Sequence, residues 1–108
     1  MTRAMDTLTR LETTIAQRRG ADPSSSYVAQ LQARGMPVIA RKLGEEAVET
    51  VVAALSGDDE ELVGEAADLL FHLLVLLGEK HIALAQVLAE LDRREGLSGL
   101  DEKASRSE

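Results

Sequence analysis

The sequence predicts an all-α fold, a helical bundle of about five helices that is completed by homo-oligomerisation. Ala, Leu, Glu, Arg and Gln dominate, and no stretch shows the sustained two-residue alternation typical of strands. A chain of 108 residues has a modest core, so association with a second copy is expected. Residues 1–95 are expected to form one domain. Residues 96–108 are rich in Gly, Ser and charge, and are interpreted as a C-terminal tail of that domain, with its flexibility left open.

The first helix is expected from about Met5 to Arg18. Leu8, Leu11 and Ile15 recur there at three- and four-residue spacing, which places them on one side of a helix. The segment Gly20-Ala21-Asp22 is typical of a break and ends this element.

The second helix is expected to begin at Asp22 and Pro23. An Asp followed by Pro is typical of an N-cap and a first helical residue, so Ser24 to Ser26 are interpreted as the first helical turn rather than as a nucleophile. Gly35 is expected to end this helix. The third helix then runs from Met36 through Leu55.

The fourth and fifth helices follow a short turn. Residues 56–59 read Ser-Gly-Asp-Asp, and an Asp in that turn can cap a fourth helix that extends through Gly78. That helix is apolar nearly all round, so much of it is expected to be buried. The fifth helix is expected from about Ala83 to Arg94.

Charge is distributed unevenly along the chain. The net charge is −7, which argues against a general nucleic-acid-binding protein. Residues 1–42 carry seven basic and three acidic side chains, whereas residues 43–79 carry ten acidic side chains and no Lys or Arg. An acids-only segment repels itself unless a cation sits there; the alternative is a solvated acidic face.

The acidic side chains form two stripes on successive helices. On a helical wheel, the third helix gathers four polar side chains within roughly 100° and the fourth gathers four within roughly 60°. These are Lys42, Glu45, Glu46 and Glu49, and then Glu61, Glu65, Asp68 and His72. Because the two helices are joined by a short turn, they are expected to pack antiparallel with their stripes facing each other.

Carboxylates in this arrangement favour a magnesium site, with Mn²⁺ as the alternative. Oxygen ligands suit these two cations, whereas a di-iron bundle would need Glu-x-x-His on paired helices. The chain has no cysteine, which excludes zinc-thiolate and iron–sulfur sites as well as thiol catalysis. It also has no glycine-rich phosphate loop, so bound metal would have to hold any phosphate.

Two glycines interrupt these helices. Gly44 and Gly64 each precede a stripe acid, although glycine inside a helix costs about 0.5–1 kcal/mol relative to Ala. We interpret them as sites of close packing between helices.

The two stripes resemble a known signature. Lys42 to Glu49, followed by Glu65-Ala-Ala-Asp68, resembles the E-E-x-x-E … E-x-x-D motif of the all-α nucleotide pyrophosphohydrolases, the MazG-like superfamily. Beyond that motif, the chain is similar to the phosphoribosyl-ATP pyrophosphatase family from about Leu8 to Lys103. The additional matches are Arg18-Arg19, Ser26-Tyr27, the segment around His72, and the tail from Gly96.

The resemblance implies a specific reaction. It implies Mg²⁺-dependent hydrolysis of phosphoribosyl-ATP to phosphoribosyl-AMP and pyrophosphate, the second step of histidine biosynthesis. It also implies dimers or larger assemblies of helices, of which a homodimer is expected. Carried over by position, Glu46, Glu49, Glu65 and Asp68 would be the metal ligands. Glu45 or Glu46 would orient the attacking water.

Contacts to the substrate are predicted at six further positions. Basic side chains are the natural partners of its phosphates. The candidates are Lys42, Arg18, Tyr27, His72, Arg94 and Lys103. For Lys42, the alternative is an ion pair with Glu46; for Arg18, it is an interaction with the carbonyl end of its own helix.

Two other functions stay open at this point. One is a house-cleaning pyrophosphohydrolase for another nucleotide, and the other is a non-catalytic helical interaction module whose acids are solvated. The N-terminus shows no signal peptide and no apolar run is long enough for a bilayer, so a cytoplasmic location is expected, with no nucleic-acid or membrane partner.

Overall fold

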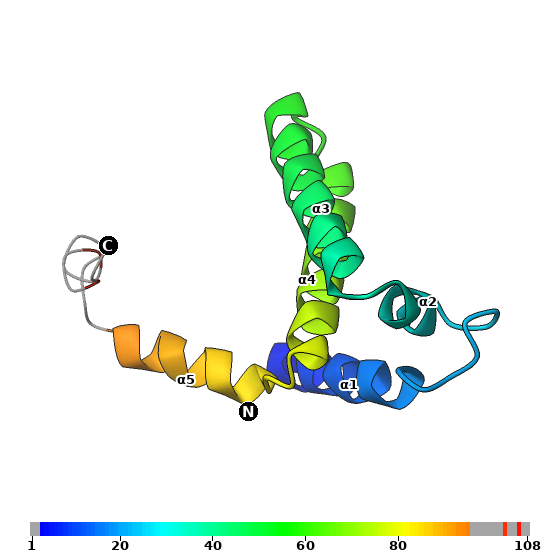
Figure 1. Cartoon of the computed structure of the whole chain (residues 1–108). Coiled ribbons are helices and arrows are strands. Elements are labelled where there is room, and N and C mark those ends of the chain that lie inside the picture. The colour runs from blue at the N-terminus through cyan, green and yellow to red at the C-terminus, as the bar shows by residue number, and fades with distance from the viewer. Residues whose placement is uncertain (1–2, 96–102, 104–105, 107–108) are drawn as a thin grey trace.

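A computed structural model describes residues 3–95 together with residues 103 and 106. Over these residues the secondary structure consists of five α-helices and contains no strand, which confirms the all-α prediction. The helices are α1 (Arg3–Arg18), α2 (Tyr27–Arg34), α3 (Met36–Ser56), α4 (Asp59–Glu79) and α5 (Leu84–Arg94) (Figure 1). Most of the predicted tail, residues 96–108, lies outside the described residues. None of the described helices is long and apolar enough to cross a membrane.

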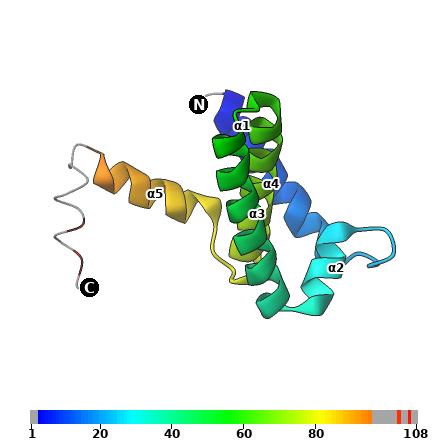
Figure 2. The same ribbon diagram turned by 90° about the horizontal axis from the view of Figure 1, so that it is seen from above.

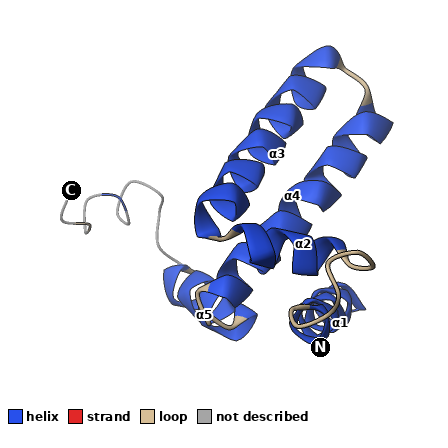
Figure 3. Ribbon diagram, turned by 45° about the vertical axis from the view of Figure 1, so that its right-hand side comes forward, coloured by secondary structure: helices blue, strands red, loops and turns tan. Residues whose placement is uncertain are grey.

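Helices α3 and α4 form a long antiparallel hairpin (Figures 1 and 3). Each helix has 21 residues. The link between them is Gly57, in the left-handed region at φ 84°, and Asp58. The carboxylate of Asp58 accepts a hydrogen bond from Glu61 N at 3.1 Å, so the predicted Asp cap of the fourth helix is confirmed.

The start of α2 differs from the prediction. Ser26, not Asp22, is the N-cap: its buried hydroxyl accepts a hydrogen bond from Ala29 N at 3.2 Å. The Asp22 carboxylate instead accepts from Ser24 N at 3.0 Å, closing a turn before the helix. Since that turn already uses Asp22, helix formation is delayed by four residues. The predicted end at Gly35 is confirmed, and its φ of 90° suits glycine.

The core lies at one end of the hairpin, where α1 and α2 pack against it (Figure 1). All five helices contribute at least one side chain to this core. Its members are Ile15, Val28, Leu31, Ile39, Leu74, Val75 and Leu84. Because Ile39 is near the start of α3 and Val75 near the end of α4, the core surrounds only the base of the hairpin.

The outer half of the hairpin is not enclosed by the other helices. On α4, Val63 is 69% exposed and Leu70 46%, whereas His72, Leu74 and Val75 are buried, so the single chain buries only part of this apolar helix. On α3, Val51 and Leu55 are also exposed. The physical reason is geometric: α1 and α2 cover the base, and α5 runs away from the hairpin (Figures 1 and 2).

The glycines of the hairpin do not mark contacts within the chain. A Cβ built on Gly44 or on Gly64 would meet no other atom within 4 Å among the described residues. The prediction of close helix packing at these two positions is therefore wrong for the single chain, because both glycines lie on exposed sides of their helices.

Candidate metal centre

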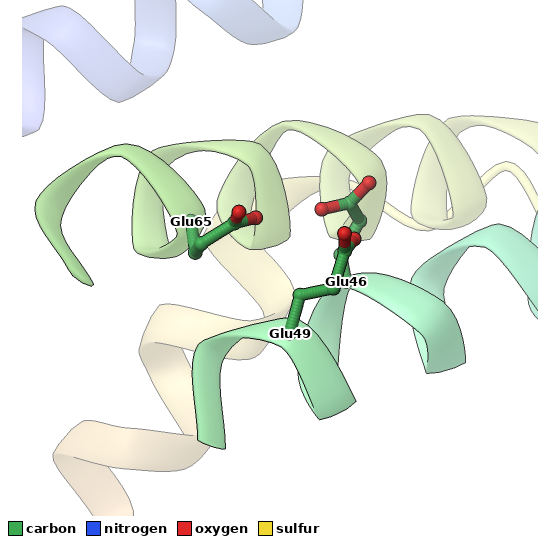
Figure 4. A group of neighbouring side chains, drawn as sticks. All are labelled: Glu46, Glu49 and Glu65. Carbon is green, nitrogen blue, oxygen red and sulfur yellow. The ribbon is translucent and has the colours of Figure 1, made fainter. Parts of the chain in front are cut away.

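Three carboxylates from the two helices of the hairpin converge on one point. Glu46 and Glu49 project from α3, and Glu65 projects toward them from α4 (Figure 4). One carboxylate oxygen from each lies within 4.8 Å of those of the other two. A three-residue spacing places the α3 pair on one helix face, and the antiparallel hairpin places Glu65 opposite them.

Glu46 is the buried member of this cluster, with 9% of its surface exposed. Burial, together with the charges of Glu49 and Asp68, raises the pKa of its carboxyl group above the usual range, and the charge of His72 opposes this rise. Its Oε2 atom is buried and has no hydrogen-bond partner among the described residues. A carboxylate oxygen left unpaired beside other carboxylates is a costly arrangement that a divalent cation would relieve.

Asp68 stands at the edge of the cluster. It is not among the three residues whose oxygens converge, but its charge lies close enough to Glu46 to raise the pKa of that group. The fourth carboxylate of the predicted ligand set is therefore adjacent to the other three. Glu61, which shared the predicted stripe on α4, is exposed and lies outside the cluster.

Thr50 connects the two helices at the level of the cluster. Its hydroxyl lies 2.8 Å from the carbonyl oxygen of Glu46 and 3.3 Å from that of Glu65. The sequence reasoning missed this residue. A threonine four residues after Glu46 can bond back to the preceding helical turn, which is the one signal that could have indicated it.

Tyr27 and His72 contact each other at the start of α2. The Tyr27 hydroxyl lies 3.0 Å from His72 Nε2, while His72 Nδ1 lies 2.8 Å from the carbonyl oxygen of Asp68. A carbonyl only accepts, so Nδ1 carries the hydrogen. The Tyr27 ring also stacks on Phe71, with centroids 6.0 Å apart. This pair therefore joins α2 to the Asp68 turn of α4.

Lys42 pairs with Glu45 rather than with Glu46. Its ammonium group lies 3.4 Å from the Glu45 carboxylate, and the alternative ion pair with Glu46 is not formed. The bond to Glu45 and the proximity of Tyr27 raise the pKa of Lys42. Arg41 also reaches Glu45, at 3.5 Å. Two cations thus lie beside the acidic cluster, on the same helix.

A groove of about 880 Å³ runs along this side of α3. Its described lining residues all belong to α3: Arg41, Lys42, Gly44, Glu45, Glu46, Val48 and Glu49. The volume is within the range of pockets that hold small molecules. A groove with one helix as its described wall is open on the opposite side.

The remaining predicted substrate contacts lie apart from the cluster. Arg18 is exposed in the last turn of α1. Arg94 ends α5, which runs away from the hairpin (Figure 2). Its guanidinium group bonds to the Glu90 carboxylate at 2.9 Å. Lys103 is exposed, and its neighbours on both sides lie outside the described residues. The single chain does not bring these three cations to the groove.

Known proteins share this sequence over almost its full length. A relative from Erythrobacter litoralis, named phosphoribosyl-ATP pyrophosphatase, is 71% identical over 104 residues, covering 96% of this chain and all of the relative. Relatives of the same name from Rhizorhabdus wittichii and Novosphingobium aromaticivorans are 70% and 67% identical. Each of these two alignments covers 93% of this chain and 94% of the relative.

A family model gives the same result from a different comparison. The model of the phosphoribosyl-ATP pyrophosphohydrolases matches residues 8–95, which include all five helices apart from the first residues of α1. The match spans both carboxylate-bearing helices and the turn between them. The chain belongs to the phosphoribosyl-ATP pyrophosphohydrolase family.

Proposed function

We propose that this chain hydrolyses phosphoribosyl-ATP to phosphoribosyl-AMP and pyrophosphate, the second step of histidine biosynthesis, with Mg²⁺ bound by its acidic cluster. The observation that carries this is the convergence of Glu46, Glu49 and Glu65, the first two of which line an open groove, in a chain of this family. The reaction acts on a nucleotide, so a cytoplasmic location is part of the proposal.

Glu46, Glu49, Glu65 and Asp68 are the proposed metal ligands. Three of them already converge, and the unpartnered oxygen of Glu46 fits a cation with oxygen ligands, Mg²⁺ or the alternative Mn²⁺. When bound, the metal neutralises charge on the phosphates of the substrate. The carboxylates would hold the metal ion in place. Without a cation, their negative charges would repel a polyphosphate.

Glu45 and Glu46 are the proposed residues that orient water for attack on the phosphoanhydride. Both line the groove, and Glu45 is exposed to it while tied to Lys42. Lys42 is the proposed phosphate contact nearest the cluster, and Tyr27 and His72 lie on the same side of the site. The chemistry is a direct displacement, since the chain offers no cysteine for a covalent intermediate.

A second copy of the chain is proposed to close the groove. Gly44, Val48, Val51 and Leu55 follow one another at spacings of four, three and four residues along α3. That spacing is typical of a helix packed against another helix, yet all four residues are exposed. A partner on this stripe would cover it and supply the missing wall, and Arg18, Arg94 and Lys103 are proposed to reach the substrate in that dimer.

A pyrophosphate-release assay tests the reaction. Phosphoribosyl-ATP, ATP, dCTP and dUTP are compared at equal concentration with and without Mg²⁺, using the wild-type chain. The proposal is supported if pyrophosphate is released from phosphoribosyl-ATP but not from the other three nucleotides, and only when Mg²⁺ is present. Preference for another nucleotide would indicate a house-cleaning enzyme.

Thermal unfolding separates enzyme from interaction module. Added Mg²⁺ or Mn²⁺ should raise the melting temperature, because a ligand that binds the folded state stabilises it. A solvated acidic face predicts no response to either cation.

A further inference from the structure

Thr50 is placed unlike an ordinary helical threonine. In the ordinary case the hydroxyl bonds back to the carbonyl four residues earlier in its own helix, as the Thr13 hydroxyl does with the carbonyl of Thr9 at 3.1 Å. The Thr50 hydroxyl makes the same bond to the carbonyl of Glu46, at 2.8 Å. It also lies 3.3 Å from the carbonyl of Glu65 on the neighbouring helix. One half-buried hydroxyl thus contacts the backbones of two residues whose carboxylates converge.

We propose that Thr50 is a positioning residue for the metal centre, which sets the separation of the Glu46 and Glu65 carboxylates by holding their two backbones at a fixed distance. This inference rests on the proposed metal site. The hydroxyl has one hydrogen, which the carbonyl of Glu46 receives at the shorter distance and that of Glu65 shares at the longer one.

The position of this contact explains why it matters. The core holds the base of the hairpin, whereas Glu46 and Glu65 lie farther along it, beyond the core side chains Ile39 on α3 and Leu74 on α4. Glu46 and Glu65 come from different helices, so any change in helix separation there changes the distance between their oxygens. Mg²⁺ demands near-ideal geometry at its ligands and is sensitive to such changes. A hydroxyl bridging both backbones restrains the separation where the core does not.

Valine and serine at position 50 give a matched pair of variants. Thr50→Val keeps the branched shape but replaces the hydroxyl with a methyl group, which cannot bond to either carbonyl. Thr50→Ser keeps the hydroxyl and loses the methyl group. Thr13→Val is the control, because it removes a hydroxyl bond within a single helix, far in sequence from the cluster.

The test measures Mn²⁺ binding to the full-length chain by calorimetry, and melting temperature in the presence of a chelator. Thr50→Val should weaken Mn²⁺ binding by about tenfold, the loss typical of residues that orient metal ligands. Thr50→Ser and Thr13→Val should bind Mn²⁺ as the wild type does. In the hydrolysis assay, Thr50→Val should raise the metal concentration for half-maximal rate while the rate at saturating metal stays close to wild type.

Other outcomes overturn the inference in distinguishable ways. Wild-type affinity in Thr50→Val would show that the hydroxyl does not position the ligands. Equal weakening in Thr50→Ser would assign the effect to packing of the methyl group. An equal loss of Mn²⁺ affinity in Thr13→Val would assign the effect to a general loss of stability. If the wild-type chain itself failed to bind Mn²⁺, the proposed metal site would fall, and not merely the role of Thr50.

Discussion

At the scale of single residues, the buried carboxyl group of Glu46 is electrostatically unfavourable in its charged form. Its buried carboxylate lies beside Glu49 and has a pKa above the usual range. A carboxyl group with a raised pKa in the folded state stabilises the fold below its unfolded pKa, and that contribution is lost as pH rises through the folded pKa. The metal-free protein is therefore destabilised by Glu46 at neutral pH.

Glu46→Gln should raise the melting temperature of the chelator-treated protein at pH 7. The gain should shrink toward pH 4, where the wild-type carboxyl group takes up a proton and repulsion from Glu49 is relieved. Melting curves over this pH range measure the effect. Glu45→Gln is the control: Glu45 is exposed and pairs with Lys42, so its neutralisation should give no such gain.

Removal of a single proposed ligand should abolish activity while the fold persists. Glu49→Gln and Asp68→Asn should each lower metal-dependent hydrolysis by more than about 100-fold, since even residues that only orient ligands cost 10–100-fold. Pyrophosphate release at saturating Mg²⁺ and circular dichroism check the two halves of this prediction. Glu61→Gln, on the same helix but outside the cluster, should keep near wild-type activity; normal turnover in either ligand variant would refute the site.

At the scale of elements, the start of α2 determines where Tyr27 stands. Ser26 caps this eight-residue helix, and Tyr27 is its first residue, from which the hydroxyl reaches His72. Short helices depend strongly on their caps because few internal hydrogen bonds hold them. The cap thus links a local sequence feature to a side chain of the candidate site.

Ser26→Ala should destabilise the protein by about 1 kcal/mol, the typical cost of losing an N-cap. In a domain of this size that corresponds to a fall of about 4–8 °C in melting temperature. Ser25→Ala removes an exposed turn hydroxyl one position earlier and should cost much less. If Asp22→Ala lowered the melting temperature more than Ser26→Ala does, Asp22 and not Ser26 would be the N-cap of α2.

At the scale of the whole molecule, the exposed stripe on α3 predicts a dimer. Val51 and Leu55 are 58% and 83% exposed, an arrangement that a partner helix would bury. The wild-type chain should therefore run at twice the mass of one chain in light scattering at micromolar concentration. Val51→Glu and Leu55→Glu should shift it to the monomer, because a buried unpaired charge is strongly unfavourable.

Ala33→Glu is the control for this shift. Ala33 is exposed on α2, away from the stripe, so a charge there should leave the dimer intact. A stable wild-type monomer would contradict the predicted dimer. A dimer that persisted in both Val51→Glu and Leu55→Glu would show that the interface does not include this stripe. Loss of hydrolysis in the monomeric variants would further support a groove closed by the partner.

The sequence by itself determined the features that depend on neighbours along the chain. Helical periodicity predicted five helices, and residue chemistry predicted an Asp cap in the turn at residues 56–59 and the end of the second helix at Gly35, whereas the cap predicted at Asp22 was wrong. The acids-only segment, with its three- and four-residue spacings, predicted that carboxylates on α3 and α4 would face one another, and three of them do. The helices, the caps and the spacing within each stripe follow from local geometry, and the short link of Gly57 and Asp58 brings the two stripes together.

Only the tertiary structure decided what depends on the distance between elements. It placed Thr50 between two backbones, paired Lys42 with Glu45, and left Gly44 and Gly64 without neighbours in the chain. It also exposed Val63 and Leu70 on a helix whose composition indicated burial. An apolar residue in a sequence shows that burial is favourable but not which surface provides it. A short chain has few helices with which to cover its hairpin, so some apolar surface stays exposed in the single chain.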